Sequence, residues 1–470
     1  MRFKKASALV TLATAVTLLA AGCSSSKNNT PSTGGSSSST DNSGAQPASK
    51  IKPVTMTGDC AAYGKYGKYS GATVTMYASI TDPEGGYLQQ SWKQFETCTG
   101  ITIQYTGDKE FETAIKTKVE GGNAPDIAII PQPGLLQTFA SAGKLKPASQ
   151  AVTDEAKANW VKDWISYGSF DGVFFGAPMG ANLKSLVWYS PKMFAKAGYS
   201  IPKTWDEMVA LSDKIAATGQ KPWCAGIESG TATGWTATDW MEEVMLRMYG
   251  PDVYDQWVQH KIPFNDQKVQ DVLAAVGKIW KNPKYVNAGI GDVQSIATTA
   301  FAKAGLPIEK QKCWLHQQAN FYGANWDKGY TIGPKSTDDI YAFYEPPMNT
   351  NFGNPIEGGG EFVGAFTDTA QVEAVQLYLA SGEWATSRAK IHPGWISANQ
   401  KVDKTVFTDP VDALSVGILT DPKATFRFDG SDAMPSAVGA GSFWSEMTKW
   451  IQGQSDKATL DNIEKSWPAS

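Results

Sequence analysis

Carboxylates that lie next to aromatic rings are the residues of this chain best suited to ligand chemistry. Trp235 and Trp240 flank Asp239 where a glycine-containing loop enters a predicted helix. An aromatic face packs on apolar groups and a carboxylate accepts hydrogen bonds. One interpretation makes one tryptophan a stacking platform and Asp239 a hydroxyl acceptor. The other makes Asp239 a charge at the helix N-terminus and Trp240 a core residue.

Further polar and aromatic candidates lie at the ends of other predicted elements. Glu228 follows an apolar strand and opens a Ser-Gly loop, and because a buried carboxylate is costly without partners, a ligand or hinge contact is favoured. The segment RFDGSD, residues 427–432, is the densest polar cluster near a predicted strand end. Its Arg427, Asp429 and Asp432 either bind a ligand or form an internal salt bridge. Trp395 and Trp444 are further candidate platforms, although Trp444 also fits the apolar stripe of its own helix.

No recognisable catalytic motif accompanies these residues. The chain contains no Gly-x-Ser-x-Gly elbow, no His-Glu-x-x-His and no P-loop. A glycoside hydrolase would need two carboxyl groups at a defined separation around the scissile bond, which spacing along the chain does not measure. Together with the lipoprotein-like first residues and the family resemblance described below, this lack of motifs predicts a binding protein and no enzyme. A secreted glycoside hydrolase and a polysaccharide-binding surface lipoprotein are the alternatives.

The elements that position these residues begin with an alternation of strand and helix. Residues 72–78, 101–105 and 126–130 have strand patterns, and residues 87–97 and 111–120 have helical spacing. Such alternation predicts a parallel sheet covered by helices, in an α/β fold. Ligands of these sheets lie at the carboxyl ends of the strands, so the loops 79–86 and 131–134 are expected to face a ligand.

Farther along the chain, a strand is predicted over residues 183–189 and a helix over 205–217, with Thr204 as N-cap and Glu207 completing a capping box. Strands are also predicted at 340–344 and 361–366. The remaining helices are predicted at 239–249, 269–280, 293–304, 370–380, 442–451 and 459–465.

The first residues of the chain predict export. Arg2, Lys4 and Lys5 precede an apolar run over 8–21, and small residues lead to Cys23. The run is shorter than the ~20 residues of a membrane span. This segment resembles a bacterial lipoprotein signal peptide, cleaved after residue 22, with lipid attached to Cys23. Residues 23–71 then comprise the anchor, a Ser- and Gly-rich flexible tether and the start of the folded body.

Charge and cysteine content indicate which ligands and cross-links this chain can have. Removal of residues 1–22 takes away three cations, so the formal net charge changes from −4 to about −7, and no basic patch for nucleic acid is present. Cys60, Cys98, Cys224 and Cys313 predict two disulfides with three possible pairings. Cys60 with Cys98 and Cys224 with Cys313 is favoured, because each pair then lies within one candidate lobe. A zinc site is a weak alternative, since no Cys-x-x-Cys spacing exists. No metal or cofactor is predicted.

Several segments together resemble the sugar-binding lipoproteins of ABC importers, which are extracellular solute-binding proteins of the maltose and α-glucoside type. Besides the anchor and tether, the segments that carry the resemblance are APDIA (124–128), GANLKSLVWYS (180–190), PKTWDE (202–207), PWCAGIESG (222–230), GWTATDW (234–240), CWLHQ (313–317) and RFDGSDAMP (427–435). Their order and spacing cover nearly the whole mature chain.

The resemblance implies the two-lobed fold of periplasmic binding proteins of type II. Lobe 1 would comprise residues 72–184 and 361–393, and lobe 2 residues 185–360 and 394–470. Strands that cross near 182–186 and 358–362 would form the hinge, where glycines absorb backbone rotation at low cost.

The resemblance also implies a function. A monomer anchored to the outer face of the cell membrane would capture an oligosaccharide, in particular an α-glucoside, and deliver it to a membrane permease. Sugars need hydrogen-bonding groups for their hydroxyls and flat rings for their C–H faces. The predicted site therefore adds residues of lobe 1 and the crossings to those above: Glu84, Gln132, Asn182, Lys184 and Glu361.

Overall fold

The computed structural model describes residues 45–391, 393–421 and 423–468. The predicted signal peptide, residues 1–22, and the predicted lipidation site Cys23 lie outside the described residues. Within the described part, no helix is both long and apolar enough to cross a membrane.

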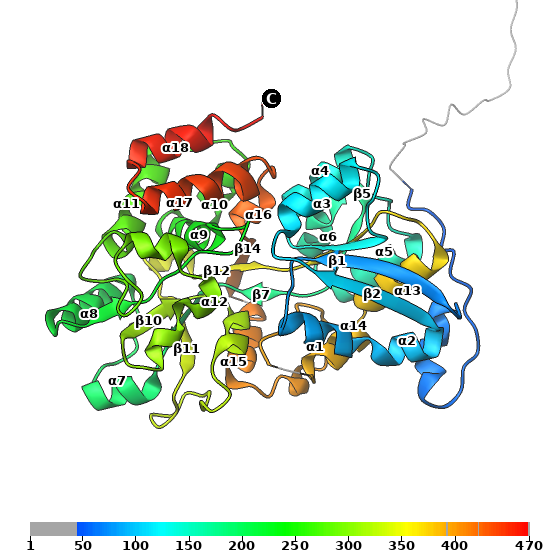
Figure 1. Cartoon of the computed structure of the whole chain (residues 1–470), viewed down its shortest axis with the longest axis horizontal. Coiled ribbons are helices and arrows are strands. Elements are labelled where there is room, and N and C mark those ends of the chain that lie inside the picture. The colour runs from blue at the N-terminus through cyan, green and yellow to red at the C-terminus, as the bar shows by residue number, and fades with distance from the viewer. Residues whose placement is uncertain (1–44, 392, 422, 469–470) are drawn as a thin grey trace, which may run out of the picture. The chain divides into compact units, whose positions relative to one another are not determined.

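The predicted alternation of strand and helix forms a five-stranded sheet in the order β2-β1-β3-β13-β6. Its strands β1 and β2 lie side by side (Figure 1). β1 runs parallel to β2 and to β3, as predicted, but β13 pairs antiparallel with both β3 and β6. The prediction of a purely parallel sheet was therefore wrong, because two strands from distant parts of the chain join its edge. The strands are β1 (Ala72–Ala78), β2 (Ile101–Gly107), β3 (Ile127–Ile130), β6 (Gly176–Pro178) and β13 (Phe362–Ala365).

A second sheet has four strands in the order β11-β8-β10-β9. Its two central strands, β8 and β10, are buried along their whole length. The strands are β8 (Leu186–Tyr189), β9 (Lys221–Trp223), β10 (Cys313–Gln317) and β11 (Tyr341–Tyr344). A separate short hairpin joins β4 (Ser169–Phe170) to β5 (Val173–Phe174).

Three strands form a small sheet in the order β14-β12-β7, which connects the two larger sheets. β7 (Asn182–Leu183) lies in the chain between β6 of one sheet and β8 of the other, and β12 (Asn354–Gly359) lies between β11 and β13. β7 and β12 pair antiparallel, and β12 pairs parallel with β14 (Ala424–Phe428). The strand predicted over 183–189 is thus two strands in two sheets, interrupted at Lys184 and Ser185.

Helices pack around these sheets. They are α1 (Glu84–Ser91), α2 (Lys93–Thr99), α3 (Phe111–Glu120), α4 (Pro133–Ser141), α5 (Gln150–Asn159), α6 (Lys162–Tyr167), α7 (Pro191–Ala197), α8 (Trp205–Ala217), α9 (Trp235–Tyr249), α10 (Pro251–Val258), α11 (Gln267–Trp280), α12 (Phe301–Ala304), α13 (Ala370–Leu379), α14 (Gly382–Ala389), α15 (Pro410–Leu419), α16 (Gly430–Ala433), α17 (Trp444–Ile451) and α18 (Asp456–Glu464).

Helix α8 shows how local sequence sets an element boundary. Thr204 accepts a hydrogen bond from the backbone N–H of Glu207 at 3.2 Å, as predicted for the N-cap. The Glu207 carboxylate accepts from the N–H of Lys203 at 2.7 Å, one residue before the position that a capping box uses.

The prediction of one helix over residues 293–304 was wrong. The chain forms a 3-10 turn at Gln294–Thr298 and then extends before α12. Extension lets Thr299 accept from the N–H of Glu228, while Phe301 donates to the carbonyl of Glu228. A non-local strand-like pairing therefore replaces the helical hydrogen bonds there.

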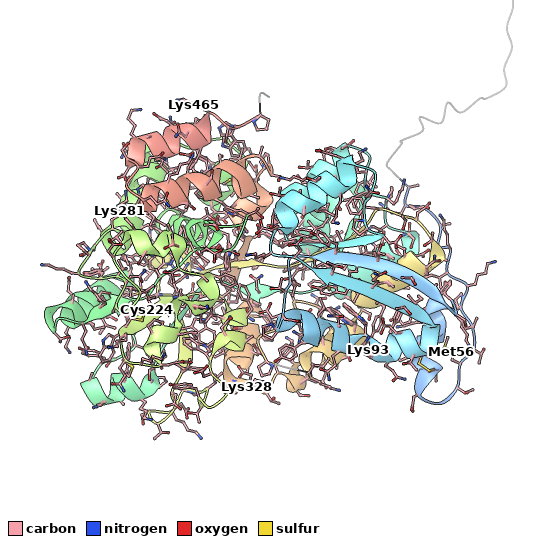
Figure 2. The ribbon with its side chains drawn as sticks, in the orientation of Figure 1. Met56, Lys93, Cys224, Lys281, Lys328 and Lys465 are labelled. Carbon is pink, nitrogen blue, oxygen red and sulfur yellow. A yellow bond between two sulfur atoms is a disulfide. The ribbon has the colours of Figure 1, made fainter. Side chains whose placement is uncertain are left out.

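Both predicted disulfides are present: Cys60 with Cys98 and Cys224 with Cys313. Cys224 lies inside the folded body, whereas Lys93, Lys328 and Lys465 are exposed at its outside (Figure 2). The described cysteines thus follow the favoured pairing.

Candidate ligand-binding site

A cavity of about 340 Å³ lies at the carboxyl ends of β1 and β3. The loops after these strands, residues 79–84 and 131–132, line it, as the strand pattern predicted. Residues from the crossing after β6, from α9 and from the segments around α12 and α17 complete the lining. Loops that follow strands of the five-stranded sheet and helical segments from later parts of the chain therefore contribute to one cavity.

Ten of the fourteen residues predicted to bind a ligand line this cavity. They are Glu84, Gln132, Asn182, Lys184, Trp235, Glu361, Trp395, Asp429, Asp432 and Trp444. The structure thus brings together residues that are more than 300 positions apart in the sequence. Their role in binding a ligand stays a prediction.

The other four residues lie outside the lining. Trp240 is 3 % exposed and packs edge-on against Trp223 at 5.2 Å, so it is the core residue of the alternative interpretation. Arg427 forms an ion pair with Asp255, with Nε 2.6 Å from Oδ1. Glu228 accepts a hydrogen bond from the N–H of Gly230 at 3.0 Å and so stabilises its own loop. Asp239 lies directly behind the cavity wall, where it binds Lys184.

One wall of the cavity is aromatic. The ring of Trp235 contacts Phe301 with centroids 5.2 Å apart and Phe321 with centroids 6.1 Å apart. Lys184 Nζ lies 5.1 Å from the centroid of the Trp235 ring, a cation–π contact. Trp444 also lines the cavity and donates from Nε1 to the hydroxyl of Ser431 at 3.1 Å. These rings provide flat apolar faces next to fixed charges.

Charged residues from α1, from α14 and from the residue before β13 form another part of the lining. Burial raises the pKa of Glu84 to about 7, against the attraction of Arg388. Burial also raises the pKa of Glu361 to about 7, and the nearby charge of Glu84 acts in the same direction. Burial lowers the pKa of Arg388 to about 10, although Glu84 opposes this. Arg388 also lies over the Trp395 ring, 5.5 Å from its centroid. This wall offers hydrogen-bond acceptors and donors for hydroxyl groups.

A buried ion cluster lies where the aromatic wall meets the crossing strands. Lys184 Nζ is 2.7 Å from Asp239 Oδ1 and forms a second, shorter ion pair with Asp429. Burial alone would lower the pKa of Lys184, but the two carboxylates raise it well above its usual value. Burial raises the pKa of Asp239 to about 8 against the attraction of Lys184. For Asp429 the attraction of Lys184 outweighs burial and lowers the pKa.

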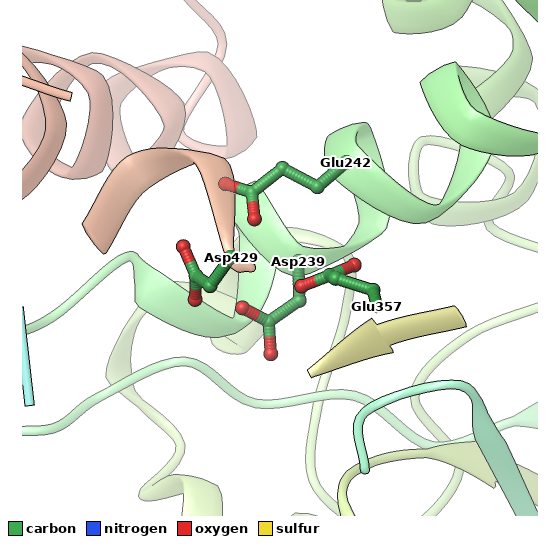
Figure 3. Close-up of side chains that lie close together, drawn as sticks. All are labelled: Asp239, Glu242, Glu357 and Asp429. Atoms are coloured by element: carbon green, nitrogen blue, oxygen red, sulfur yellow. The ribbon is translucent and has the colours of Figure 1, made fainter. Parts of the chain in front are cut away.

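The same cluster contains an oxygen-rich set of side chains. Carboxylate oxygens of Asp239, Glu242, Glu357 and Asp429 lie within 4.8 Å of one another (Figure 3). Oxygen donors of this kind suit hard cations such as Ca²⁺ and Mg²⁺. Here the Lys184 ammonium contacts two of the four carboxylates, and burial raises the pKa values of Glu242 and Glu357 well above their usual range. The Lys184 ammonium therefore compensates part of the charge of this set, and the raised pKa values favour the neutral forms of Glu242 and Glu357.

Arg388, Phe301 and Phe321 are among the lining residues that sequence reasoning missed. Arg388 lies four residues after buried Trp384, a spacing that places both on the inward face of α14. That spacing was a usable signal. Phe301 and Phe321 gave no comparable signal, because the hydrogen bonds that hold Phe301 at the cavity come from Glu228, far away in the sequence.

Comparison with known proteins identifies the kind of site. A model of the family described as bacterial extracellular solute-binding protein matches residues 78–390. The chain belongs to this family. Members of the family bind solutes for ABC importers and are not catalytic, so this solute-binding protein is the extracellular binding component of an importer and not a hydrolase.

Two relatives match this solute-binding protein over most of their length. The osmoprotective compounds-binding protein GgtB of Synechocystis sp. is 37 % identical over 413 residues, which cover 87 % of this chain and 96 % of GgtB. The alpha-glucosides-binding periplasmic protein AglE of Rhizobium meliloti is 34 % identical over 417 residues, which cover 84 % of this chain and 87 % of AglE. The structure also superposes on the bacterial solute receptor AcbH with a TM-score of 0.70 at 19 % identity. The superposition covers 84 % of this chain and 97 % of AcbH. This likeness confirms the predicted type II fold.

The solute-binding protein should be less stable at alkaline pH. We expect its thermal unfolding midpoint to fall between pH 6.5 and 8.5, because folding raises the pKa of Glu361 to about 7 and of Asp239 and Asp412 to about 8. A carboxyl group with a raised folded-state pKa stabilises fully below its unfolded pKa of ~4, and this stabilisation is lost as pH rises through the folded value. In the folded protein His316, with a pKa lowered to about 4, is neutral throughout this range. Differential scanning calorimetry at a series of pH values measures the slope of the unfolding midpoint against pH.

The variant Asp412→Asn provides the control for this pH dependence. Its amide oxygen can still accept from the N–H of Gly394, which the wild-type carboxylate contacts at 2.9 Å. The slope should become shallower because one titrating group is removed. A midpoint that is constant or rises from pH 6.5 to 8.5 in the wild type would contradict the assignment of raised pKa values.

Proposed function

We propose that the protein captures an α-linked glucoside of about disaccharide size for import. The cavity of about 340 Å³ is near the lower end of the ~300–1,000 Å³ typical of ligand pockets, so it suits a short sugar better than a long polymer. The name of AglE refers to alpha-glucosides, and that of GgtB to osmoprotective compounds. A small glucoside that also acts as an osmoprotective compound agrees with both.

The observation that carries this proposal is the pairing of an aromatic wall with a charged wall. Trp235, Phe301 and Phe321 offer faces for the C–H groups of a sugar ring. Glu84, Glu361 and Arg388, together with Asn182 and Gln132, offer partners for its hydroxyls. A sugar presents these two kinds of surface on one small molecule.

Binding would close two lobes around the sugar. In this proposal lobe 1 comprises residues 72–184 and 361–393, and lobe 2 residues 185–360 and 394–470. A Cβ added to Gly134 would lie 1.9 Å from the carbonyl oxygen of Met434, so the proposed lobes already touch beside the cavity. The ligand favours closure to the extent that it binds the closed form better than the open one.

The closed, monomeric protein would then dock on a permease in the membrane from which it is suspended. Lipid on Cys23 and the tether that follows would keep it close to that permease. Expressed in its bacterial host, Cys23→Ala should release the protein into the soluble extracytoplasmic fraction. Membrane association of this variant equal to that of the wild type would exclude the lipid anchor.

Calorimetric titration tests the ligand. Trehalose, sucrose, maltose and palatinose should include at least one saturable ligand with 1:1 stoichiometry, whereas maltodextrins of five or more units should bind weakly. Product analysis of the same samples should find no glucose. Tight binding of long maltodextrins would overturn the proposed ligand class. The absence of binding to all four short sugars would overturn it as well.

A further inference from the structure

A buried serine links the aromatic and the acidic parts of the cavity. Ser431 lies in the short helix α16, is 1 % exposed and does not belong to the cavity lining. Its hydroxyl accepts a hydrogen bond from Nε1 of Trp444 at 3.1 Å and donates one to Oδ1 of Asp429 at 2.8 Å. Both partners line the cavity, so one hydroxyl group contacts two residues of the wall from behind.

The position of Ser431 is itself fixed by its backbone. Glu242 of α9 accepts from the N–H of Gly430 at 2.9 Å and from the N–H of Ser431 at 3.0 Å. Asp429 accepts from the N–H of Asp432 at 2.8 Å and so caps the helix. The hydroxyl of Ser431 therefore projects from a rigid turn.

Trp444 approaches this serine through an unusual backbone segment. The π-helical turn Val438–Phe443 directly precedes Trp444, and such turns are frequent at functional sites. A Cβ on Gly439 would lie 1.7 Å from the carbonyl oxygen of Ser431, so the π turn packs directly on the backbone of this serine. The contact with Ser431 thus fixes both the segment that carries Trp444 and the orientation of its indole N–H.

We propose that Ser431 is a positioning residue that sets the distance between the Trp444 ring and the Asp429 carboxylate and thereby the affinity for the ligand. A sugar that packs on a ring and donates a hydroxyl to a carboxylate requires these two groups at a fixed spacing. Ser431 joins them through a single oxygen atom. This inference rests on the proposed sugar function for its affinity effect, but its structural part is independent of the ligand.

The test is a double-mutant cycle with Ser431→Ala and Trp444→Phe, which keeps a ring but removes the N–H. Trp444→Phe should bind the sugar found by calorimetry about tenfold more weakly, because it removes the hydrogen bond to Ser431. Ser431→Ala should lose at least as much affinity, because it removes this bond together with the hydrogen bonds of the hydroxyl to Asp429 and from Thr238. The double variant should bind no more than about twofold more weakly than Ser431→Ala, because the bond that Trp444→Phe removes is already lost in Ser431→Ala. The proposal would be refuted if the losses of affinity in the two single variants multiplied in the double variant, or if Ser431→Ala bound the sugar as tightly as the wild type.

Ser212→Ala is a matched control. Ser212 is fully buried and accepts a hydrogen bond from Trp223 Nε1 at 2.9 Å, but neither residue lines the cavity. The control should lose stability without losing affinity. Equal affinity losses in Ser212→Ala and Ser431→Ala would show a general packing effect and overturn the positioning role.

A second measurement needs no ligand. In protein labelled with ¹⁵N-tryptophan, the indole resonance that disappears in Trp444→Phe belongs to Trp444. In Ser431→Ala this resonance should shift and lose protection from hydrogen exchange, whereas Ser212→Ala should leave it unchanged. An unchanged resonance in Ser431→Ala would refute the inference even if no tested sugar binds, whereas wild-type protein that binds no sugar would refute only the proposed function.

Discussion

Replacement of Lys184 by Met should lower the free energy of unfolding by ~3–5 kcal/mol, the range seen when one partner of a buried ion pair is removed. The side chain of Lys184 is 5 % exposed, and those of its partners Asp239 and Asp429 are 1 % exposed. Without the ammonium group, two carboxylates remain buried without its compensating charge. Urea-induced unfolding at pH 9, above the pKa of about 8 of Asp239, measures the loss.

An exposed ion pair provides the matched control for this prediction. Lys192 lies 3.3 Å from Asp339, but its side chain is 66 % exposed. Because exposed pairs contribute little, Lys192→Met should change stability by at most ~0.5 kcal/mol. A similar small effect of Lys184→Met would show that the buried cluster does not depend on lysine.

The effect of Lys184→Met should also depend on pH and on its partner. The loss should be smaller at pH 5 than at pH 8, because Asp239 and Asp429 can then take up protons inside the folded variant. Addition of Asp239→Asn to Lys184→Met should recover part of the stability, since it removes one uncompensated charge. A loss independent of pH and of Asp239 would indicate a packing defect instead.

Local sequence patterns were sufficient for the elements whose hydrogen bonds are local. The ranges of β1, α3 and α8 agree with prediction, because strand alternation, helical spacing and an N-cap are all recorded in adjacent residues. Elements that depend on distant partners were predicted less well. The broken helix after Val293 and the division of residues 182–189 between two sheets both follow from pairing with remote segments.

Helix geometry explains why only part of the Trp235–Trp240 segment faces the ligand cavity. Successive residues of an α-helix are ~100° apart, so residues five positions apart point in directions that differ by ~140°. Trp235 therefore lines the cavity while Trp240 packs in the core. Asp239, four residues after Trp235, shares its side of α9 and binds the Lys184 ammonium that lies over the Trp235 ring. The spacing alone could have separated the two tryptophans.

Replacement of Trp235 by Ala should lower the affinity for the proposed glucoside roughly 30- to 100-fold, or ~2–3 kcal/mol. The ring is half-buried at the cavity and is supported by Phe301 and Phe321, so a ligand that packs on it gains contact area without ordering a mobile side chain. Alanine has a high helix propensity and should preserve the first turn of α9. Isothermal titration calorimetry measures the loss.

Trp467→Ala separates this loss from the general effect of removing a half-buried tryptophan. Trp467 stacks on His260 with centroids 4.1 Å apart and does not line the cavity. The control should bind the glucoside as the wild type does, and Trp235→Phe, which keeps a smaller ring, should lose less affinity than Trp235→Ala. Wild-type affinity in Trp235→Ala would mean that the sugar does not use this ring. The aromatic contact would then have to come from Trp395 or Trp444, which also line the cavity.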